Sequence, residues 1–174
     1  MLKKASKTKP SGAAGTRVAI VASRYNARYV NSMLRAAKAE LAKARVAAEV
    51  VRVPGAFEIP AVASALARRL TNPIDAIPGQ CFRFLADFTF GGRRLCLGVI
   101  LRGETTHAEN IGQAVTGALA QLQVEHSLPV IHEVLLLENV QQARERCLDA
   151  RNNRGIEAAR TAIEMTRVMR RVGV

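Results

Sequence analysis

Residues 95–110, LCLGVILRGETTHAEN, constrain the fold of this chain more than any other stretch of its sequence. The uninterrupted apolar run Leu95–Leu101 is typical of a strand buried on both faces of a parallel sheet. The polar residues after it include Thr106 and Glu109, which have the spacing of a helix capping box. Apolar residues then recur at helical period, at Ile111, Val115, Ala118, Leu119 and Leu122. The stretch therefore predicts a strand, a tight turn and a helix that ends near Ser127.

The turn between this strand and this helix is a candidate ligand site. In an open α/β sheet, ligands bind in the crevice at the carboxyl ends of the strands. A helix that begins there offers free backbone N–H groups to an anion. His107 lies in the first turn of the expected helix, where its imidazole can act on a bound molecule.

Two strand–helix units are expected before this one. The first has a strand at Arg17–Ser23 and a helix from Ala27 to about Arg45, and the second has a strand at Glu49–Val53 and a helix opened by residues 56–60. The apolar faces of the two helices are Val30, Met33, Leu34, Ala37 and Leu41, and then Val62, Leu66 and Leu70.

A fourth unit has a strand at Pro129–Leu137, followed by a short helix with Asn139 as its N-cap and Gln142 at the capping-box position. A last helix runs from Ile156 to about Val172, with Ala158, Ala162, Met165 and Met169 on one side. Four β-α units in series predict an α/β fold: a three-layer α/β/α sandwich with a four-stranded parallel sheet, in a flavodoxin-like arrangement with right-handed crossovers.

The domain organisation follows from composition. Residues 1–16 are expected to form a flexible basic arm, and residues 17–174 a single domain. An apparent insertion at about 71–94 breaks the pattern, with prolines, glycines and four of the five Phe residues. A surface helical turn, a small hairpin or a contact with another chain could bury these rings.

The formal net charge of +12 is spread over the arm and the domain. A solvated tail is one interpretation of the arm, and attraction to nucleic acid is the other. The basic residues are not interleaved with aromatic residues, and the sequence has no helix-turn-helix or zinc-finger spacing. It therefore does not indicate a protein that recognises a specific nucleic acid. A basic domain also favours phosphorylated small molecules.

The three cysteines are scattered and lack C-x-x-C spacing, which predicts neither a disulfide framework nor a zinc site and favours a reducing cytoplasm.

No apolar segment approaches the roughly 20 residues of a membrane span, and the amino terminus lacks the apolar core of a signal peptide. We therefore expect no membrane partner.

Two more residues lie at the expected strand-to-helix junctions. Tyr25 follows the first strand, where its ring could pack against the core or face a ligand. Glu58 follows the second strand, where its carboxylate could cap the next helix or bind a ligand.

Four segments stand at the strand-to-helix junctions and in the last two units: VPGAFEIP at 53–60, RGETTH at 102–107, PVI at 129–131 and NRGIEAA at 153–159. Together these segments resemble the 6,7-dimethyl-8-ribityllumazine synthase family. Their order and spacing match over about residues 17–169. The family condenses 5-amino-6-(D-ribitylamino)uracil with 3,4-dihydroxy-2-butanone 4-phosphate to 6,7-dimethyl-8-ribityllumazine, with loss of phosphate and water, in the penultimate step of riboflavin biosynthesis. The resemblance implies no metal and no organic cofactor.

The resemblance also implies roles for the matching residues. Tyr25 would stack on the pyrimidine ring, and Glu58 would accept hydrogen bonds from the ribityl hydroxyls. The phosphate would lie at the amino terminus of the helix near Thr106, bound by the amides of Glu104 and Thr105 and by the Thr105 hydroxyl. The other implied substrate-binding residues are Asn26, Gly55, Ala56, Phe57, Val99, Ile100, Leu101 and His132.

For catalysis, His107 would relay protons, and Arg146 would reach the phosphate from a neighbouring subunit. Family members form homopentamers, and some build icosahedral shells of sixty subunits. His132 stands where the family often has an aromatic residue that closes the neighbouring pocket.

Two other classes of protein stay open. The fold could serve as a basic shell or nucleic-acid-binding protein whose catalysis is lost, which would fit the charge. A generic nucleotide-binding doubly wound domain is less consistent with the sequence, because no G-x-G-x-x-G or G-x-x-x-x-G-K-[ST] follows any expected strand.

Overall fold

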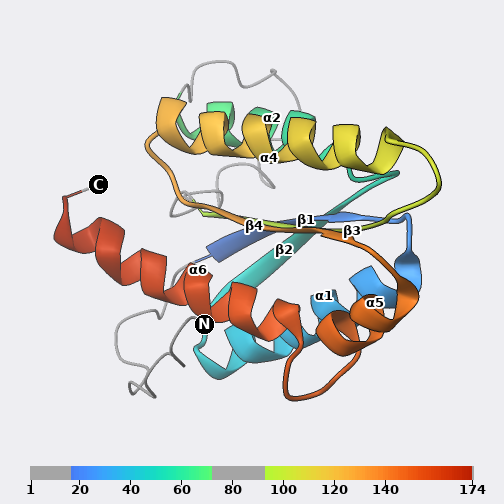
Figure 1. Ribbon diagram of the computed structural model, residues 1–174. Coiled ribbons are helices and arrows are strands. Elements are labelled where there is room, and N and C mark those ends of the chain that lie inside the picture. The colour runs from blue at the N-terminus through green and yellow to red at the C-terminus, as the bar shows by residue number, and fades with distance from the viewer. Residues whose placement is uncertain (1–16, 72–92, 174) are drawn as a thin grey trace, which may run out of the picture.

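The computed structural model describes residues 17–71 and 93–173 (Figure 1). The expected basic arm and most of the expected insertion lie outside these residues. Four parallel strands form one sheet in the order β2-β1-β3-β4. The strands are β1 (Arg17–Ser23), β2 (Ala47–Val53), β3 (Arg94–Leu101) and β4 (Val130–Leu137), and the helices are α1 (Ala27–Lys43), α2 (Ile59–Thr71), α4 (His107–Glu125), α5 (Val140–Cys147) and α6 (Arg154–Arg171).

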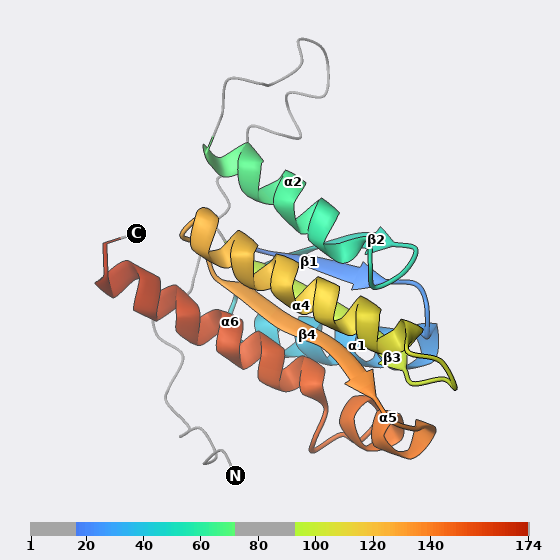
Figure 2. The same cartoon turned by 45° about the horizontal axis from the view of Figure 1, so that its top comes forward.

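Helices cover both faces of the sheet, as predicted. α2 and α4 lie on one face, and α1, α5 and α6 lie on the other (Figures 1 and 2). The apolar runs of the sequence explain this arrangement, because a strand buried on both faces needs two helical layers to exclude water. The three-layer α/β/α sandwich with a four-stranded parallel sheet is therefore confirmed.

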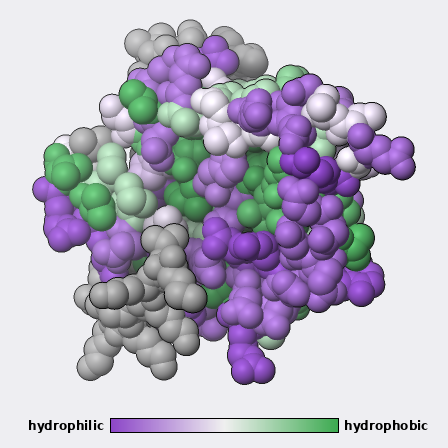
Figure 3. Space-filling model, in the orientation of Figure 1, coloured by the Kyte–Doolittle hydropathy of each residue, from purple (hydrophilic) through white to green (hydrophobic). Residues whose placement is uncertain are grey.

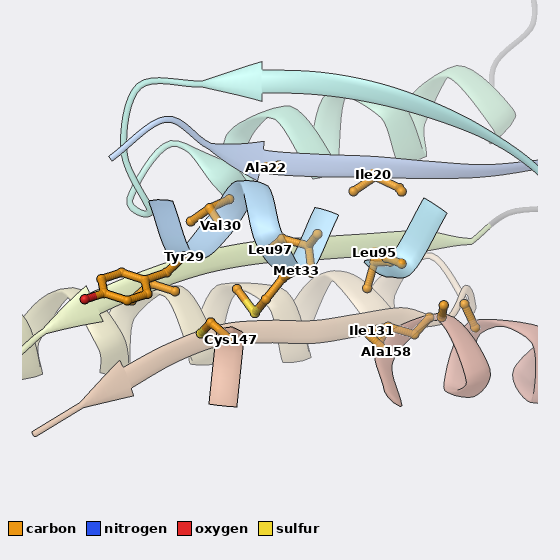
Figure 4. Packing of buried hydrophobic residues seen from close by; sticks show 14 of the residues in the cluster. Ile20, Ala22, Tyr29, Val30, Met33, Leu95, Leu97, Ile131, Cys147 and Ala158 are labelled. Carbon is orange, nitrogen blue, oxygen red and sulfur yellow. The ribbon is translucent and has the colours of Figure 1, made fainter. Parts of the chain in front are cut away.

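The central strand β3 divides its side chains between two apolar cores. Leu95, Leu97 and Val99 pack toward α1, α5 and α6, and Cys96 and Ile100 pack toward α2 and α4. The first core also contains Ile20, Val30, Met33, Ile131, Cys147 and Ala158 (Figure 4). This alternation follows from the two-residue period of a strand.

The helix faces differ in part from the expected ones. In α2 the buried residues are Ile59, Ala63 and Ala67, whereas Val62 and Leu66 are only partly buried, and the side chain of Leu70 lies outside the described structure. Small residues on this face let α2 approach the sheet closely. In α4, Ala118 is exposed and Ala108 is buried instead, because Ala108 shares the stripe formed by the buried residues Val115, Leu119 and Leu122.

The helix ends test the predicted caps. The side chain of Asn139 accepts a hydrogen bond of 2.9 Å from the Gln142 amide, so the predicted cap of α5 is confirmed. α6 begins at Arg154, two residues before the expected start, because the Asn153 side chain accepts a bond of 2.9 Å from the amide of Gly155. In the part of the chain described by the structure, no helix is long and apolar enough to span a bilayer.

Candidate active site

The carboxyl ends of β1 and β2 are joined by backbone hydrogen bonds. The amide of Arg24 donates to the carbonyl of Val53 at 2.8 Å, and the amide of Tyr25 donates to the carbonyl of Pro54 at 3.0 Å. These bonds join residues at or just after the ends of the two strands, where parallel strands bring their exit loops together. This carboxyl-terminal edge of the sheet is termed the strand edge. The two loops therefore form one connected wall.

Asn26 connects this wall to β3. Its backbone has φ of 53°, in the left-handed region that asparagine tolerates better than most residues. Its side-chain amide donates a hydrogen bond of 2.8 Å to the carbonyl oxygen of Val99. Three strand-to-helix junctions, distant in the sequence, therefore meet at one edge of the sheet.

Two aromatic rings are exposed at this edge. Tyr25 is 70% exposed and Phe57, in the loop between β2 and α2, is 60% exposed. Tyr25 therefore does not pack into the core of its own chain, and that alternative from the sequence is wrong. Exposed aromatic rings beside a strand edge offer apolar faces to a flat ligand.

Glu58 participates in the loop structure at the same edge. One carboxylate oxygen accepts a hydrogen bond of 2.8 Å from the amide of Gly55, and the residue is exposed. A Cβ atom at position 55 would lie 2.9 Å from that oxygen, so a side chain there would displace the Glu58 carboxylate. Glu58 thus stabilises the loop and keeps its carboxylate accessible, while Ala56 between them is buried.

The β3–α4 junction is the third part of the edge. Val99 and Ile100 are buried, Leu101 is half-buried, and residues 102–107 are exposed. The Thr105 hydroxyl oxygen accepts a weak bond of 3.4 Å from the amide of His107. Within the described residues, the amides of Glu104 and Thr105 make no hydrogen bond, which leaves them free for an anion.

The predicted capping box of α4 is wrong. Thr106 is the N-cap residue, but its side chain makes no capping bond. The carboxylate of Glu109 pairs instead with Arg102, whose Nε also lies 2.9 Å from a carboxylate oxygen of Glu138. An ion pair to the end of β3 has therefore replaced the local cap, and it fixes the loop that leads to His107.

Arg146 lies away from these residues. It is exposed on α5 and lines a hollow of about 390 Å³ together with Glu145, Asp149, Asn152, Arg154 and Glu157. The surface over α5 and the start of α6 is mostly hydrophilic (Figure 3). No residue of the strand edge lines this hollow, and α5 lies on the opposite face of the sheet from α4. One chain therefore does not bring Arg146 and His107 into one cavity.

His132 also lies apart from the strand edge. It pairs with Cys96 in the register of the sheet, five residues before β4 ends at Leu137. Its Nε2 atom is 3.1 Å from the hydroxyl oxygen of Thr116 on α4, and that hydroxyl donates to the carbonyl of Gly112 at 2.7 Å. Burial lowers the pKa of His132. The side chain is half-buried on the α4 side of β4, which is an edge strand.

The sequence analysis assigned no functional role to three charged residues in or beside the hollow. Arg154 and Glu157 share the hollow with Arg146, and buried Glu133 pairs with Arg154. The signal for Glu133 was an acid inside an apolar strand. The signal for the other two was an Arg–Glu pair three residues apart at a helix start.

The candidate active site therefore has two parts. The strand edge carries the exposed aromatic rings, the accessible Glu58 carboxylate and the free backbone amides, and the separate hollow contains the guanidiniums of Arg146 and Arg154. No group of three or more potential metal ligands is present among the residues that the structure describes.

A comparison of the sequence with known protein families identifies one that matches the chain. The sequence model of the 6,7-dimethyl-8-ribityllumazine synthase family matches residues 15–79 and 83–170, which is most of the chain. The match includes all three junctions, α5 and nearly all of α6. The members of this family are transferases that form lumazine in riboflavin biosynthesis. From its strand edge to its last helix, the chain belongs to the 6,7-dimethyl-8-ribityllumazine synthase family.

Proposed function

We propose that this chain condenses 5-amino-6-(D-ribitylamino)uracil with 3,4-dihydroxy-2-butanone 4-phosphate to give 6,7-dimethyl-8-ribityllumazine, phosphate and water, as the penultimate step of riboflavin biosynthesis. Family membership supports the class of product. The observation that carries the choice of site is the hydrogen-bonded meeting of three junctions, through Asn26 and the carbonyl of Val99, beside two exposed aromatic rings.

The uracil binds against the strand edge. The ring of Tyr25 stacks on the pyrimidine, because stacking on a flat heterocycle removes the exposed aromatic face from water. The carboxylate of Glu58, already oriented by the Gly55 amide, accepts hydrogen bonds from the ribityl hydroxyls. The wall of the binding site is completed by Ala56, Phe57, Ile100 and Leu101.

The phosphate of the second substrate binds at the amino terminus of α4. The free amides of Glu104 and Thr105 and the Thr105 hydroxyl donate to its oxygens, and the helix dipole favours its negative charge. This position places the reacting four-carbon chain next to His107, the first residue of α4.

Arg146 completes the phosphate site from a neighbouring subunit. Its own hollow contains no residue of the strand edge, so its guanidinium reaches a phosphate only across an interface. We propose that His132, on edge strand β4, also contributes to the pocket of a neighbouring subunit. We therefore propose a homopentamer, or a shell of sixty subunits, as the active assembly.

In the reaction, the 5-amino group of the uracil attacks the ketone and forms a Schiff base with loss of water. Phosphate then leaves, the enol tautomerises, and the ribitylamine nitrogen closes the ring with loss of water. His107 takes up and delivers protons at these steps, which contributes roughly 10²–10⁴-fold in rate for a positioned acid–base group. The two substrates supply the nucleophile and the electrophile, so the proposal needs no metal or organic cofactor.

We also propose the cytoplasm as the location of the protein. Cys96 and Cys147 are buried free thiols, which fits a reducing compartment.

The proposal is tested by mixing the purified protein with both substrates and following the absorbance and fluorescence of the lumazine. We expect product above the spontaneous background, with a lower rate for His107→Ala and a higher KM for the butanone phosphate with Arg146→Ala. Product formation only at the background rate, by a folded and oligomeric protein, would contradict the proposed activity.

A further inference from the structure

A buried ion pair joins β4 to the first turn of α6 beside the hollow of Arg146. Glu133 points from β4 toward α6 and is only 5% exposed. Its two carboxylate oxygens accept hydrogen bonds from Arg154, at 3.0 Å from Nε and 2.8 Å from Nη2. Such a bidentate contact fixes the plane of the guanidinium as well as its position.

The remaining donors of Arg154 can be assigned. A guanidinium has five N–H groups, of which two bind Glu133 and a third, on Nη1, binds the carboxylate of Glu157. One N–H group therefore remains on each terminal nitrogen. Because Arg154 also lines the hollow, these two donors are available to a ligand there.

Burial of the Glu133 carboxylate has a desolvation cost, which argues against a purely structural purpose. On the same face of β4, Ile131 belongs to the apolar core and Leu135 packs against that core. Burial raises the pKa of Glu133 even though Arg154 and, more weakly, Arg146 favour its ionised form. An apolar residue at this position would avoid that desolvation. Residues that break the local pattern in this way are often retained for function.

Arg146 differs from Arg154 in its partners. Its guanidinium makes no ion pair or hydrogen bond within residues 17–71 and 93–173, although it is close enough to Glu133 to affect the pKa of that carboxylate. The hollow therefore presents one unpaired guanidinium, on Arg146, and one guanidinium held in place, on Arg154.

We propose that Glu133 is a positioning residue for phosphate recognition: it holds Arg154 in the wall of the hollow so that Arg154 and Arg146 together donate to the phosphate of the four-carbon substrate. This inference rests on the proposed function. Glu133 itself does not touch the substrate and acts only through Arg154.

The test compares Glu133→Gln, Arg154→Gln and the double variant with the natural chain. KM is measured separately for each substrate, and binding of inorganic phosphate is measured by calorimetry. We expect Glu133→Gln to raise the KM for the butanone phosphate and the Kd for phosphate by about tenfold, as when one charge-assisted hydrogen bond is lost. The KM for the uracil is expected to stay unchanged. In the Arg154→Gln background, Glu133→Gln is expected to have no further effect.

A matched control separates positioning from stability. Glu40 forms an ion pair of 2.8 Å with Arg160, which is also on α6 but does not line the hollow. Glu40→Gln is therefore expected to leave both KM values unchanged. If Glu133→Gln unfolds, Glu133→Asp replaces it, because the shorter side chain keeps the charge and withdraws the carboxylate from Arg154.

The outcomes distinguish the two proposals. If the natural protein forms no lumazine, the proposed function fails, and phosphate binding by the same variants still tests the role of Glu133. If the natural protein is active, two results overturn the inference: an unchanged KM for the butanone phosphate in folded Glu133→Gln, or an equal rise in both KM values. A fall in melting temperature alone would show that the pair is only structural.

Discussion

The side-chain amide of Asn26 donates a 2.8 Å hydrogen bond to the carbonyl oxygen of Val99, 73 residues away in the sequence. This contact joins the start of α1 to the central strand, and it does so from a residue in the left-handed backbone region. The geometry of the proposed uracil site therefore depends on both the side chain and the backbone of Asn26.

Substitution of Asn26 should separate these two contributions. Asn26→Gly keeps the left-handed backbone at little cost but loses the hydrogen bond, which should destabilise the fold by about 1 kcal/mol. Asn26→Ala loses the bond and also strains the backbone, which should cost about 1 kcal/mol more. Urea unfolding measures both values. Equal stabilities of the two variants would show that the left-handed conformation is not maintained.

Gly155 should tolerate no side chain. A Cβ atom there would lie 2.0 Å from the carbonyl oxygen of Met33, a backbone atom of the packed helix α1. Gly155→Ala should therefore separate α6 from α1 and destabilise the protein by about 3 kcal/mol or more. Gly117→Ala is the control, since nothing lies within 4 Å of its Cβ position. A thermal melt should show Gly117→Ala as stable as the natural chain or slightly more so.

Two carboxylates should give opposite pH dependences of stability. Burial raises the pKa of Glu133 above its ordinary 4.5. Its contribution to the stability of the folded state is therefore fully present below pH 4.5 and is lost as the pH rises through the folded pKa. For Glu40, burial acts to raise the pKa, but the hydrogen bonds from Arg160 and Lys43 outweigh it and lower the pKa below 4.5. Its contribution is present above 4.5 and is lost as the pH falls through the folded pKa.

The measurement is the free energy of unfolding on both sides of pH 4.5, for the natural chain, Glu133→Gln and Glu40→Gln. Compared with Glu133→Gln, the natural chain should lose stability as the pH rises. Compared with Glu40→Gln, it should lose stability as the pH falls. Parallel curves for the two comparisons would contradict the assigned pKa directions.

Mixed assemblies should reveal a shared active site. If His107 and Arg146 of one site come from adjacent subunits, co-refolding His107→Ala with Arg146→Ala should produce some sites with both natural residues. For equal amounts, about one site in four is intact in a closed ring of like subunits. Lumazine formation should rise to about that share of the natural rate. Activity no higher than that of the separate variants would show that each chain supplies its own site.

The sandwich itself could be predicted from local patterns. The apolar run Leu95–Leu101 and the shorter runs of the other three strands predicted a parallel sheet, and helical periods predicted the segments between them. These patterns suffice because burial against a neighbouring layer depends on the spacing of apolar residues along one segment. The predicted faces were wrong at Ala118, which lies at the edge of its stripe, where spacing alone does not decide burial.

The junction residues could be located in the same way. Residues that follow buried parallel strands must share one edge of the sheet, so Tyr25, Glu58 and His107 were expected there together. The sequence could not show that Tyr25 is exposed, or that Glu58 both binds the Gly55 amide and stays accessible. Those properties depend on the conformations of neighbouring loops.

The sequence by itself thus determined the order of the elements, the parallel sheet and the junctions at which a ligand can bind, because each depends on local apolar periodicity and on chain connectivity. Only the tertiary structure decided the pairing of charges. It placed Glu109 on Arg102 in place of a cap, Glu133 on Arg154, and Arg146 in a hollow separate from His107. An ion pair depends on the register and spacing of elements far apart in the chain, and no local pattern specifies these.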